Sequence, residues 1–252
     1  MSEIIDAHTF IGNWLGIDVS STVESLLASM EKAGIAKAVT ITTNSDENST
    51  VKKLVEAYPA RLCLGFWFFP DEKHLSYLRR HRDQIRMVKF HPSHAKVRLD
   101  DPRMTGLLEF CEQEGIRILV HCGRWLEMAG YDIALSVAEN FGAKILLAHM
   151  GGVSPDLVKK TADAIRERKV KNAYLMTSGM SGAPNVYWLE PCPPELIEYA
   201  VKCVGADRML FGSDFPFGKQ EDMVKSVEEA HLQPTEREQI FTKNAQRILH
   251  LQ

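Results

Sequence analysis

The sequence predicts an α/β fold of the (β/α)₈ type, a TIM barrel, formed by one domain over residues 1–252. Short apolar runs alternate with amphipathic helical segments along the whole chain, and eight such units can be counted. This alternation predicts parallel strands, because each crossover helix returns the chain to the same edge of the sheet. Eight units favour a closed barrel. A doubly wound open sheet is the alternative, but no Gly-x-Gly-x-x-Gly follows the first apolar run.

Strands are expected where short, mostly apolar runs lie between turn signals. The expected ranges are 3–8, 38–42, 62–68, 87–91, 117–121, 144–149, 173–177 and 208–212. Pro70 and Pro92 follow the third and fourth runs, and a proline cannot donate a backbone hydrogen bond to a sheet. The first run ends at His8 in this interpretation.

Helices are expected where apolar residues recur at helical spacing. The first begins at Ser21, where Ser-Thr-Val-Glu forms a capping box. Asp101-Pro102 and Ser154-Pro155 start the fourth and sixth helices, since proline is tolerated in the first helical position. Other helices are expected near 51–58, 73–81 and 132–141, after Pro193-Pro194, at 219–230, and in two short segments at the C-terminus.

The composition is ordinary for a globular protein, with 45% hydrophobic and 25% charged residues. A formal net charge of −3 argues against nucleic acid and anionic membranes as partners, because both attract a basic surface. No apolar run reaches membrane-spanning length, and no signal-peptide pattern opens the chain. Five cysteines without CxxC spacing favour reduced thiols and a cytoplasmic location. A small-molecule substrate is therefore expected, with a homodimer as the default assembly.

Polar residues stand where the expected strands end. Four of the nine histidines, His8, His91, His121 and His149, occupy such positions, and Asp214 follows the eighth strand. Barrel enzymes carry their catalytic groups at this end of the strands. Any one of these histidines is more readily explained as a packed core or loop residue. The whole set at one register predicts a shared site.

Lys89 precedes His91 by two residues, so both side chains point to the same face of the fourth strand. If this face is the interior, the ammonium is buried and needs a partner. Two interpretations remain open: Lys89 binds an anion or substrate carboxylate, or it pairs with Asp6 at the barrel floor.

Six motifs follow one another in order along nearly the whole chain. They are Asp6-Ala7-His8, Lys89-Phe90-His91-Pro92, Val120-His121-Cys122-Gly123, Ala148-His149-Met150-Gly151-Gly152, Phe211-Gly212-Ser213-Asp214-Phe215-Pro216 and Asn244-Ala245-Gln246-Arg247-Ile248-Leu249. Together they resemble the amidohydrolase superfamily. The most similar branch is the amidohydrolase-related family, which includes aminocarboxymuconate-semialdehyde decarboxylase and many metal-dependent hydrolases. The ordered set is specific for the fold and the superfamily, not for a substrate.

The resemblance implies roles for these residues. His8, His121 and Asp214 would bind a divalent metal ion, usually zinc, and Asp214 would also orient or deprotonate the metal-bound water. His149 would polarise the substrate or move a proton. His91 stands where related enzymes place a metal ligand or a substrate contact.

Phe10 departs from the family pattern, which has His-x-His on the first strand. Three protein ligands still satisfy the usual coordination of a catalytic zinc, whose bound water has a pKa of about 7. The opposing interpretation is a barrel that has lost its metal and binds a ligand without turnover.

Several further residues are expected around the site. Arg124 is a candidate for a substrate carboxylate because its fork matches that geometry, although a surface arginine is the slightly better explanation. Trp14, Trp125 and Phe10 are expected to contact substrate, and Ser178 and Met180 are candidates to line the pocket. The remaining assignments are to packing: Trp67, Phe68, Phe69 and Cys122.

The resemblance implies a metal-dependent hydrolase of a small, carboxylated amide, lactone or ester, in which metal-bound water is the nucleophile. Asp214 would take the proton of that water, and His149 would stabilise the developing oxyanion. The alternative on the same scaffold is a lyase, a non-oxidative decarboxylase of an aromatic or unsaturated acid. A metal-free barrel with a binding role is the third interpretation, because of Phe10.

Overall fold

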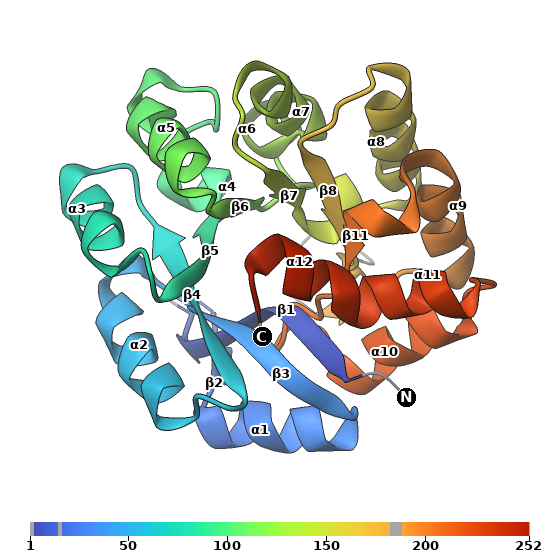
Figure 1. Ribbon diagram of the computed structural model, residues 1–252, viewed down its shortest axis with the longest axis horizontal. Helices are drawn as coiled ribbons and strands as arrows, with labels where there is room; N and C mark the ends of the chain where they lie inside the picture. Colours follow the sequence, from blue (N-terminus) through green and yellow to red (C-terminus); the bar gives the residue numbers. More distant parts are fainter. Residues whose placement is uncertain (1–2, 15–16, 182–187, 252) are drawn as a thin grey trace.

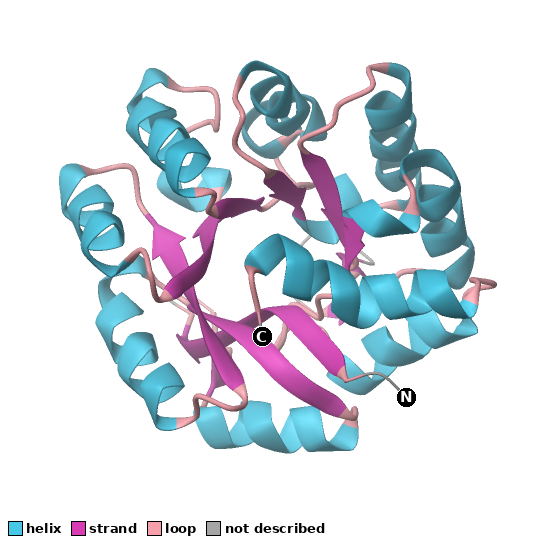
Figure 2. Ribbon diagram, in the orientation of Figure 1, coloured by secondary structure: helices cyan, strands magenta, loops and turns pink. Residues whose placement is uncertain are grey.

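The computed structural model describes residues 3–14, 17–181 and 188–251. Its main strands are β1 (Ile4–Asn13), β2 (Ser20–Ser21), β3 (Ile35–Thr42), β4 (Leu62–Phe68), β5 (Ile85–Phe90), β6 (Arg117–Val120), β7 (Ile145–Leu147), β8 (Ala173–Met176) and β11 (Met209–Leu210). They form one sheet in the order β11-β8-β7-β6-β5-β4-β3-β1-β2. Eight of these strands are parallel, as predicted, and β2 pairs antiparallel with β1. The sheet curls, with helices on its outer face (Figures 1 and 2).

The helices of the described residues confirm every predicted helical segment. They are α1 (Val23–Lys32), α2 (Asn48–Ala57), α3 (Glu72–His81), α4 (Pro92–Ala95), α5 (Thr105–Glu114), α6 (Leu126–Ala129), α7 (Tyr131–Asn140), α8 (Pro155–Glu167), α9 (Pro194–Val204), α10 (Gln220–Glu229), α11 (Pro234–Glu238) and α12 (Asn244–Leu249). Short 3₁₀ turns are η1 (Ser45–Glu47), η2 (Pro102–Met104), η3 (Ala148–Gly151) and η4 (Ala206–Arg208), and the π-helical turn η5 (Gln239–Lys243) joins α11 to α12. The sequence did not predict α4, α6 or the small hairpin of β9 (Met180–Ser181) and β10 (Leu189–Glu190).

Two local predictions at the first helix and strand are wrong. The cap of α1 is Thr22, whose side chain accepts from the Ser25 backbone, while the Ser21 hydroxyl donates to the Phe10 carbonyl. The first strand does not end at His8 but continues to Asn13, because its second half pairs with β3 and β2. His8 is therefore held inside a strand.

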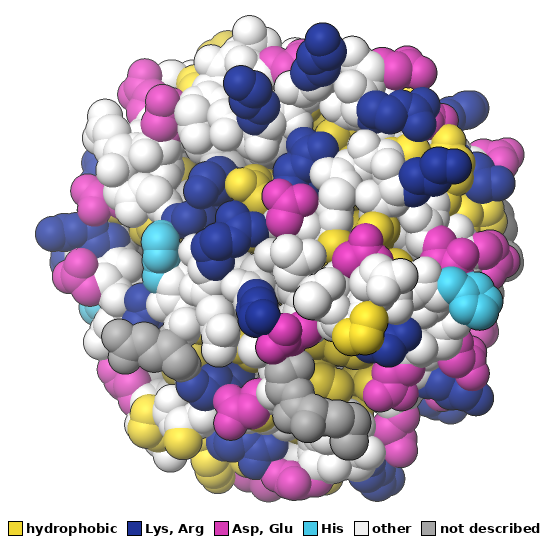
Figure 3. All heavy atoms as spheres, turned by 45° about the vertical axis from the view of Figure 1, so that its right-hand side comes forward, with side chains coloured by type: hydrophobic (Ala, Val, Ile, Leu, Met, Phe, Trp, Pro, Cys, Tyr) yellow, Lys and Arg dark blue, Asp and Glu magenta, His cyan; other side chains and the backbone are white. Residues whose placement is uncertain are grey.

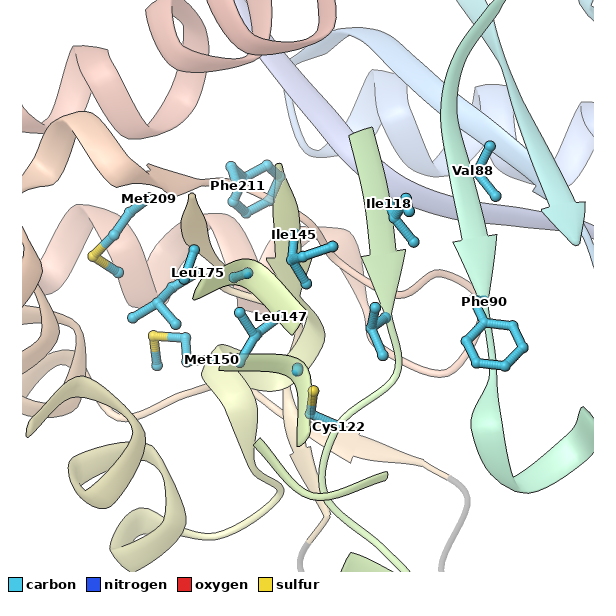
Figure 4. Close-up of a cluster of buried hydrophobic side chains, with 14 of the residues drawn as sticks. Val88, Phe90, Ile118, Cys122, Ile145, Leu147, Met150, Leu175, Met209 and Phe211 are labelled. Atoms are coloured by element: carbon cyan, nitrogen blue, oxygen red, sulfur yellow. The ribbon is translucent and has the colours of Figure 1, made fainter. Parts of the chain in front are cut away.

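Side chains alternate between two apolar layers. Along β5, Met87 and Lys89 point to the interior of the curled sheet, whereas Val88 and Phe90 pack outward against the helices (Figure 4). Cys122 lies in the same outer layer, as predicted, and burial raises the pKa of its thiol to about 12. Among the three aromatic residues expected in the core, Trp67 is buried, but Phe69 is 39% exposed. This alternation sends Lys89 into the interior.

The end of the interior opposite the strands' C-terminal tips is filled by apolar side chains. Ile248 and Leu249 of α12 pack there with Ile5 and Leu119, and Figure 1 shows α12 near the centre of the view, between β1 and β11 of the curled sheet. Positive and negative side chains are interspersed over the face shown in Figure 3. None of the helices in the described part of the chain has the length and apolarity to cross a membrane.

β1 lies beside the segment that follows β11. Backbone hydrogen bonds run from Ala7 to the Phe211 carbonyl (2.9 Å), from Phe10 to the Phe215 carbonyl (2.8 Å) and from Asp214 to the His8 carbonyl (2.8 Å). The first and last segments of the parallel set are therefore joined directly.

Asp6 reinforces this junction. Its Oδ1 accepts hydrogen bonds from the backbone of His8 and Ser213, each at 3.0 Å, and its Oδ2 accepts from Gln220 Nε2 at 2.8 Å. Burial raises the pKa of the Asp6 carboxyl to about 6, against the smaller opposing effect of these hydrogen bonds. The structure gives Asp6 these partners instead of Lys89, so the predicted Lys89–Asp6 pair is not formed.

Asp6→Asn should remove a pH dependence of stability. Folded Asp6 keeps its proton up to about pH 6, whereas the unfolded chain loses it near 3.8, so the free energy of unfolding falls as the pH rises between these values. Over this shift the loss is about 3 kcal/mol. Asparagine carries no charge, and Gln220 Oε1, which is buried without a partner, can turn to accept from its amide. Denaturant titrations at pH 4 and 7 should show a pH difference about 3 kcal/mol smaller in the variant.

Asp6→Ala is the matched comparison. It also removes the charge, but it leaves the His8, Ser213 and Gln220 donors without their acceptor, at a cost of about 1–3 kcal/mol for each buried group. This variant should be less stable than Asp6→Asn at both pH values. Equal stability of the two variants would show that the hydrogen bonds of Asp6 contribute nothing.

Candidate functional site

A cavity of about 310 Å³ opens at the C-terminal ends of the parallel strands. The predicted site residues that line it are Phe10, Trp14, Lys89, His91, His121, Arg124, Trp125, His149 and Asp214. His8, the remaining predicted residue, is fully buried and borders the cavity through Lys89 and Asp214. The structure therefore brings together the catalytic, metal-binding and substrate-binding candidates named from the sequence.

His8 is fixed at both ring nitrogens. Its Nδ1 lies 2.8 Å from Ser178 Oγ, and its Nε2 lies 3.1 Å from Lys89 Nζ and 3.0 Å from Asp214 Oδ1. Burial, followed by the nearby Lys89 charge, holds the pKa of the imidazole well below its usual value, so His8 is neutral. One nitrogen then carries a proton and the other a lone pair. Nε2 has one such position, so it either accepts from the Lys89 ammonium or donates to the Asp214 carboxylate.

Lys89 and Asp214 are the two charged groups at the cavity floor. Lys89 is 1% exposed, and burial lowers the pKa of its ammonium to about 8, while Asp214 acts in the opposite direction. Burial raises the pKa of the Asp214 carboxyl to about 6, and Lys89 opposes that shift. Each charge offsets part of the desolvation cost of the other. At neutral pH the floor therefore holds an ammonium and a carboxylate, each about 3 Å from His8 Nε2.

Three histidines form one side of the cavity. The rings of His91 and His121 stack at a centroid distance of 4.0 Å, and His149 Nε2 lies 3.2 Å from His121 Nδ1. Burial is the main cause that keeps the pKa of all three imidazoles low, to about 3 for His149. The trio is neutral, so its members act as hydrogen-bond donors and acceptors rather than as cations.

The tautomer of His149 follows from its partner. His149 Nδ1 lies 2.8 Å from the Gly179 carbonyl, which only accepts, so Nδ1 carries the proton and donates. The neutral ring then has a lone pair at Nε2, which accepts from His121. In this state His149 Nε2 accepts rather than donates, and the role expected for His149 as an oxyanion stabiliser stays a prediction. His149 is an acceptor at the cavity wall.

The backbone that carries His149 is unusual. His149, Met150 and Gly151 have consecutive positive φ angles of 56°, 48° and 86°, so the chain turns sharply after β7. Such angles are costly for residues other than glycine and occur where surrounding packing imposes them. Asp214, with φ of 60°, stands on a similar turn after β11. Tight turns thus aim both side chains into the cavity.

The donor set does not fit the metal site implied by the family resemblance. Among the described residues, no group of three or more His, Cys, Asp or Glu side chains is arranged to hold a metal ion. A metal needs the lone pair of a neutral imidazole, but His8 Nε2 faces the Lys89 ammonium and Asp214. Phe10, buried with its ring centroid 5.1 Å from that of His8, supplies no ligand. The expected set of His8, His121 and Asp214 is therefore not assembled as a metal centre.

Aromatic rings form the opposite wall. Trp14 packs edge-to-face on Phe10 at 5.3 Å and on Phe217 at 4.9 Å. At the rim, Arg124 donates to the Ser181 hydroxyl, and Trp125 is 57% exposed. The cavity is therefore apolar along its walls and charged at its floor and rim.

Several residues that line the cavity were not predicted from the sequence, above all His94 and Phe217. His94 lies on α4, and its ring packs against His91 at 4.2 Å. The spacing of His91-Pro92-Ser93-His94 was a usable signal, because a proline can begin a helical turn that presents residues three apart on one face. Ser178, expected to line the cavity, instead binds His8 behind it.

Replacing Gly151 should disturb the turn that positions His149. A Cβ at Gly151 would collide with the Thr161 side chain, in addition to the positive φ. Gly34→Ala is the matched control, since its φ is also positive (68°) but a Cβ there meets nothing within 4 Å. We expect a loss of about 1 kcal/mol in unfolding free energy for Gly34→Ala and about 3 kcal/mol for Gly151→Ala. Equal losses in chemical denaturation would contradict the packing argument.

Solved structures resemble this chain in fold over its whole length. A dihydroxybenzoic acid decarboxylase from Polaromonas sp., with bound manganese and the inhibitor 2-nitroresorcinol, has a TM-score of 0.77 at 16% identity and covers 100% of this chain and 98% of its own. A 5-carboxyvanillate decarboxylase from Sphingomonas paucimobilis has a TM-score of 0.75 at 14% identity, with 99% of both chains covered. A probable 2-pyrone-4,6-dicarboxylic acid hydrolase from Acinetobacter baumannii, with citric acid bound, has a TM-score of 0.71 at 15% identity and covers 99% and 100%.

No curated protein matches the chain in sequence. The family model described as amidohydrolase matches residues 6–251, nearly the whole sequence. That span includes the motifs around His8, His149 and Asp214 and agrees with the fold of the solved relatives. The chain therefore belongs to the amidohydrolase family of enzymes.

Proposed function

We propose that this enzyme decarboxylates a small, planar aromatic or conjugated acid without oxidation. The observation that carries the proposal is the composition of the cavity: aromatic walls, with the Lys89 ammonium and the Asp214 carboxyl both beside His8 at the floor. Its volume of about 310 Å³ suits a ligand of one ring with a few substituents. A flat acid would lie along the Trp14 and Phe217 rings with its polar groups toward the charged floor and rim.

The charged residues have distinct roles in this proposal. Lys89 stabilises the negative charge of the bound acid, and Arg124 at the rim offers a fork suited to a second anionic oxygen. The apolar walls keep water from the carboxylate that leaves. Loss of CO₂ becomes easier when that carboxylate is not solvated, because its charge disperses into the ring as the bond breaks.

Asp214 is the proton donor in this mechanism. Its protonated carboxyl delivers the proton to the ring carbon that bears the carboxylate, the carbon–carbon bond breaks, and its electron pair stays with the ring while CO₂ leaves. The product carries hydrogen where the substrate carried the carboxylate, and Asp214 regains its proton from solvent. The raised pKa of Asp214, about 6, suits a group that gives and regains a proton near neutral pH.

Two of the solved relatives support this reaction class, since both are described as decarboxylases of hydroxylated benzoic acids or a related vanillate. Their similarity to this chain is one of fold. The residues of the cavity are therefore the main support for decarboxylation. The two relatives are examples of the same fold in enzymes described as decarboxylases.

Hydrolysis is the second candidate, favoured by the relative described as a 2-pyrone-4,6-dicarboxylic acid hydrolase. In that reaction the ionised Asp214 would deprotonate a water that attacks a lactone, ester or amide carbonyl. Lys89 would hold the oxyanion, because His149 has no proton to offer at Nε2. A small carboxylated lactone fits the same cavity, but this reaction releases no CO₂.

The zinc implied by the family resemblance is not part of this mechanism, because the residues present do not fit a three-ligand site. Neighbouring decarboxylase structures carry manganese, which is a property of those proteins. We also infer that the eight parallel strands close into a barrel. The backbone hydrogen bonds from Ala7 and Phe10 to the segment after β11 support that closure.

The reaction is tested with a panel of hydroxybenzoates and of carboxylated 2-pyrones or related lactones. Decarboxylation predicts release of CO₂ from a panel member and loss of one carboxylate in the product, measured by mass spectrometry. Asp214→Asn should lower kcat by at least about 100-fold, because it removes the proton donor. Hydrolysis predicts a ring-opened product of unchanged carbon count. If no substrate of the panel gives either product at high enzyme concentration, the proposal is wrong.

Arg124→Gln should separate binding from chemistry. Loss of the guanidinium at the rim should raise KM about 10-fold while kcat changes by less than about 3-fold, since Arg124 lies away from the reacting carbon. Arg80→Gln, on the exposed face of α3, is the charge-matched control and should change neither parameter. A fall in kcat without a change in KM would contradict a binding role for Arg124.

A further inference from the structure

We propose that the Lys89 ammonium is the resident cation of this site and takes the place that a divalent metal has in the family pattern, so that the enzyme works without a metal. The inference deepens the proposed function, and its catalytic part rests on that proposal. Its central claim, that Lys89 excludes a divalent cation from the floor, concerns binding and can be decided without a substrate.

The atoms around His8 Nε2 leave no room for a metal ion beside the Lys89 ammonium. His8 Nε2 is the atom that would bind a metal, and Lys89 Nζ lies 3.1 Å from it. Asp214 Oδ1, the other expected ligand atom, lies 3.0 Å from the same nitrogen. The ammonium and the Asp214 carboxyl thus both lie against the nitrogen that a metal would need, and one of them is already positive. A second cation would have to displace the ammonium, which is 1% exposed.

Phe10 favours an ammonium over a metal ion at this position. Lys89 Nζ lies 5.8 Å from the centroid of the Phe10 ring, within the range of a cation–π contact. A histidine at this position would offer a ligand to a metal, whereas phenylalanine offers a π face to an ammonium. The departure of Phe10 from the family pattern and the position of Lys89 therefore have one common explanation.

The position of Lys89 on β5 directs its side chain into the cavity. Val88 and Phe90 on either side pack outward in the apolar layer (Figure 4). The pleat of β5 therefore points Lys89 inward, where it lines the cavity. Asp6, the alternative partner inside the sheet, already accepts from Ser213 and Gln220. Asp214 is left as the anion that offsets the ammonium.

The chemistry differs from that of a metal in a specific way. An ammonium donates hydrogen bonds and supplies a single positive charge, but it does not generate hydroxide from a bound water. It suits the stabilisation of an oxygen anion on the substrate, as in the proposed decarboxylation. Lys89 is then a catalytic residue, in direct contact with the bound acid.

Metal binding is measured first, on the full chain and without substrate. The wild-type protein is purified without chelator and analysed by mass spectrometry for bound metal, and Mn²⁺ and Zn²⁺ are titrated into it by calorimetry. We expect far less than one metal per chain and no saturable site in the micromolar range. The double variant Phe10→His/Lys89→Met restores the second ligand and removes the ammonium. It should bind Zn²⁺ at least about 100-fold more tightly than wild type, as ligand changes of this kind do.

The single variants divide the effect between the two positions. Phe10→His keeps the ammonium and should remain a weak binder, well below the double variant. Lys89→Met should lose decarboxylase activity on whichever panel acid is turned over, whereas Lys53→Met, an exposed lysine on α2, should keep it. Circular dichroism and thermal unfolding confirm that each variant is folded, and the wild-type metal measurement needs no variant at all.

Three outcomes would overturn the inference: near-stoichiometric metal in the wild type, wild-type activity that EDTA abolishes and Mn²⁺ or Zn²⁺ restores, or tight metal binding by Phe10→His alone. Failure of the substrate panel would overturn the proposed decarboxylation but leave the metal measurements intact. The two proposals therefore fail separately.

Discussion

The junction between β1 and the segment after β11 is the constraint on which the site depends. Backbone hydrogen bonds join Ala7, Phe10 and Asp214 to their partners across it, and Asp6 adds a buried carboxylate that accepts from both sides. These contacts bring residues some 200 positions apart to within hydrogen-bond distance, so His8 meets Asp214 at 3.0 Å. Without that junction the first and last elements would carry unrelated side chains, and the cavity would have no floor.

Charge is sparse in this site, and that decides its chemistry. Burial keeps His91, His121 and His149 neutral, and the partners of each then determine whether it donates or accepts. Lys89 and Asp214 remain as one positive and one negative group. A floor of this kind stabilises a small anion and moves one proton. The ammonium of Lys89 and the carboxyl of Asp214 are suited to general acid–base chemistry.

Most helices and strands could be predicted from the sequence, because the patterns that indicate them lie within short segments. Apolar periodicity and the Asp101 and Ser154 caps located the helices, and the register of histidines at strand ends located the cavity. The failures involve competition between distant partners. Ser21 has a good capping side chain, but its hydroxyl is used by the Phe10 carbonyl, so Thr22 caps α1 instead. The extension of β1 beyond His8 likewise depends on pairing with β3.

The sequence by itself determined the alternation of strands and helices, the family motifs, the shared face of Lys89 and His91 and the absence of a second histidine at Phe10, because these follow from residue type and spacing. Only the tertiary structure decided what those side chains do. Whether His8 faces a metal or an ammonium depends on which atoms the fold brings to its Nε2. Whether His149 donates or accepts depends on the Gly179 carbonyl, 30 residues away. Such choices are made by contacts between distant segments, which spacing along one chain does not encode.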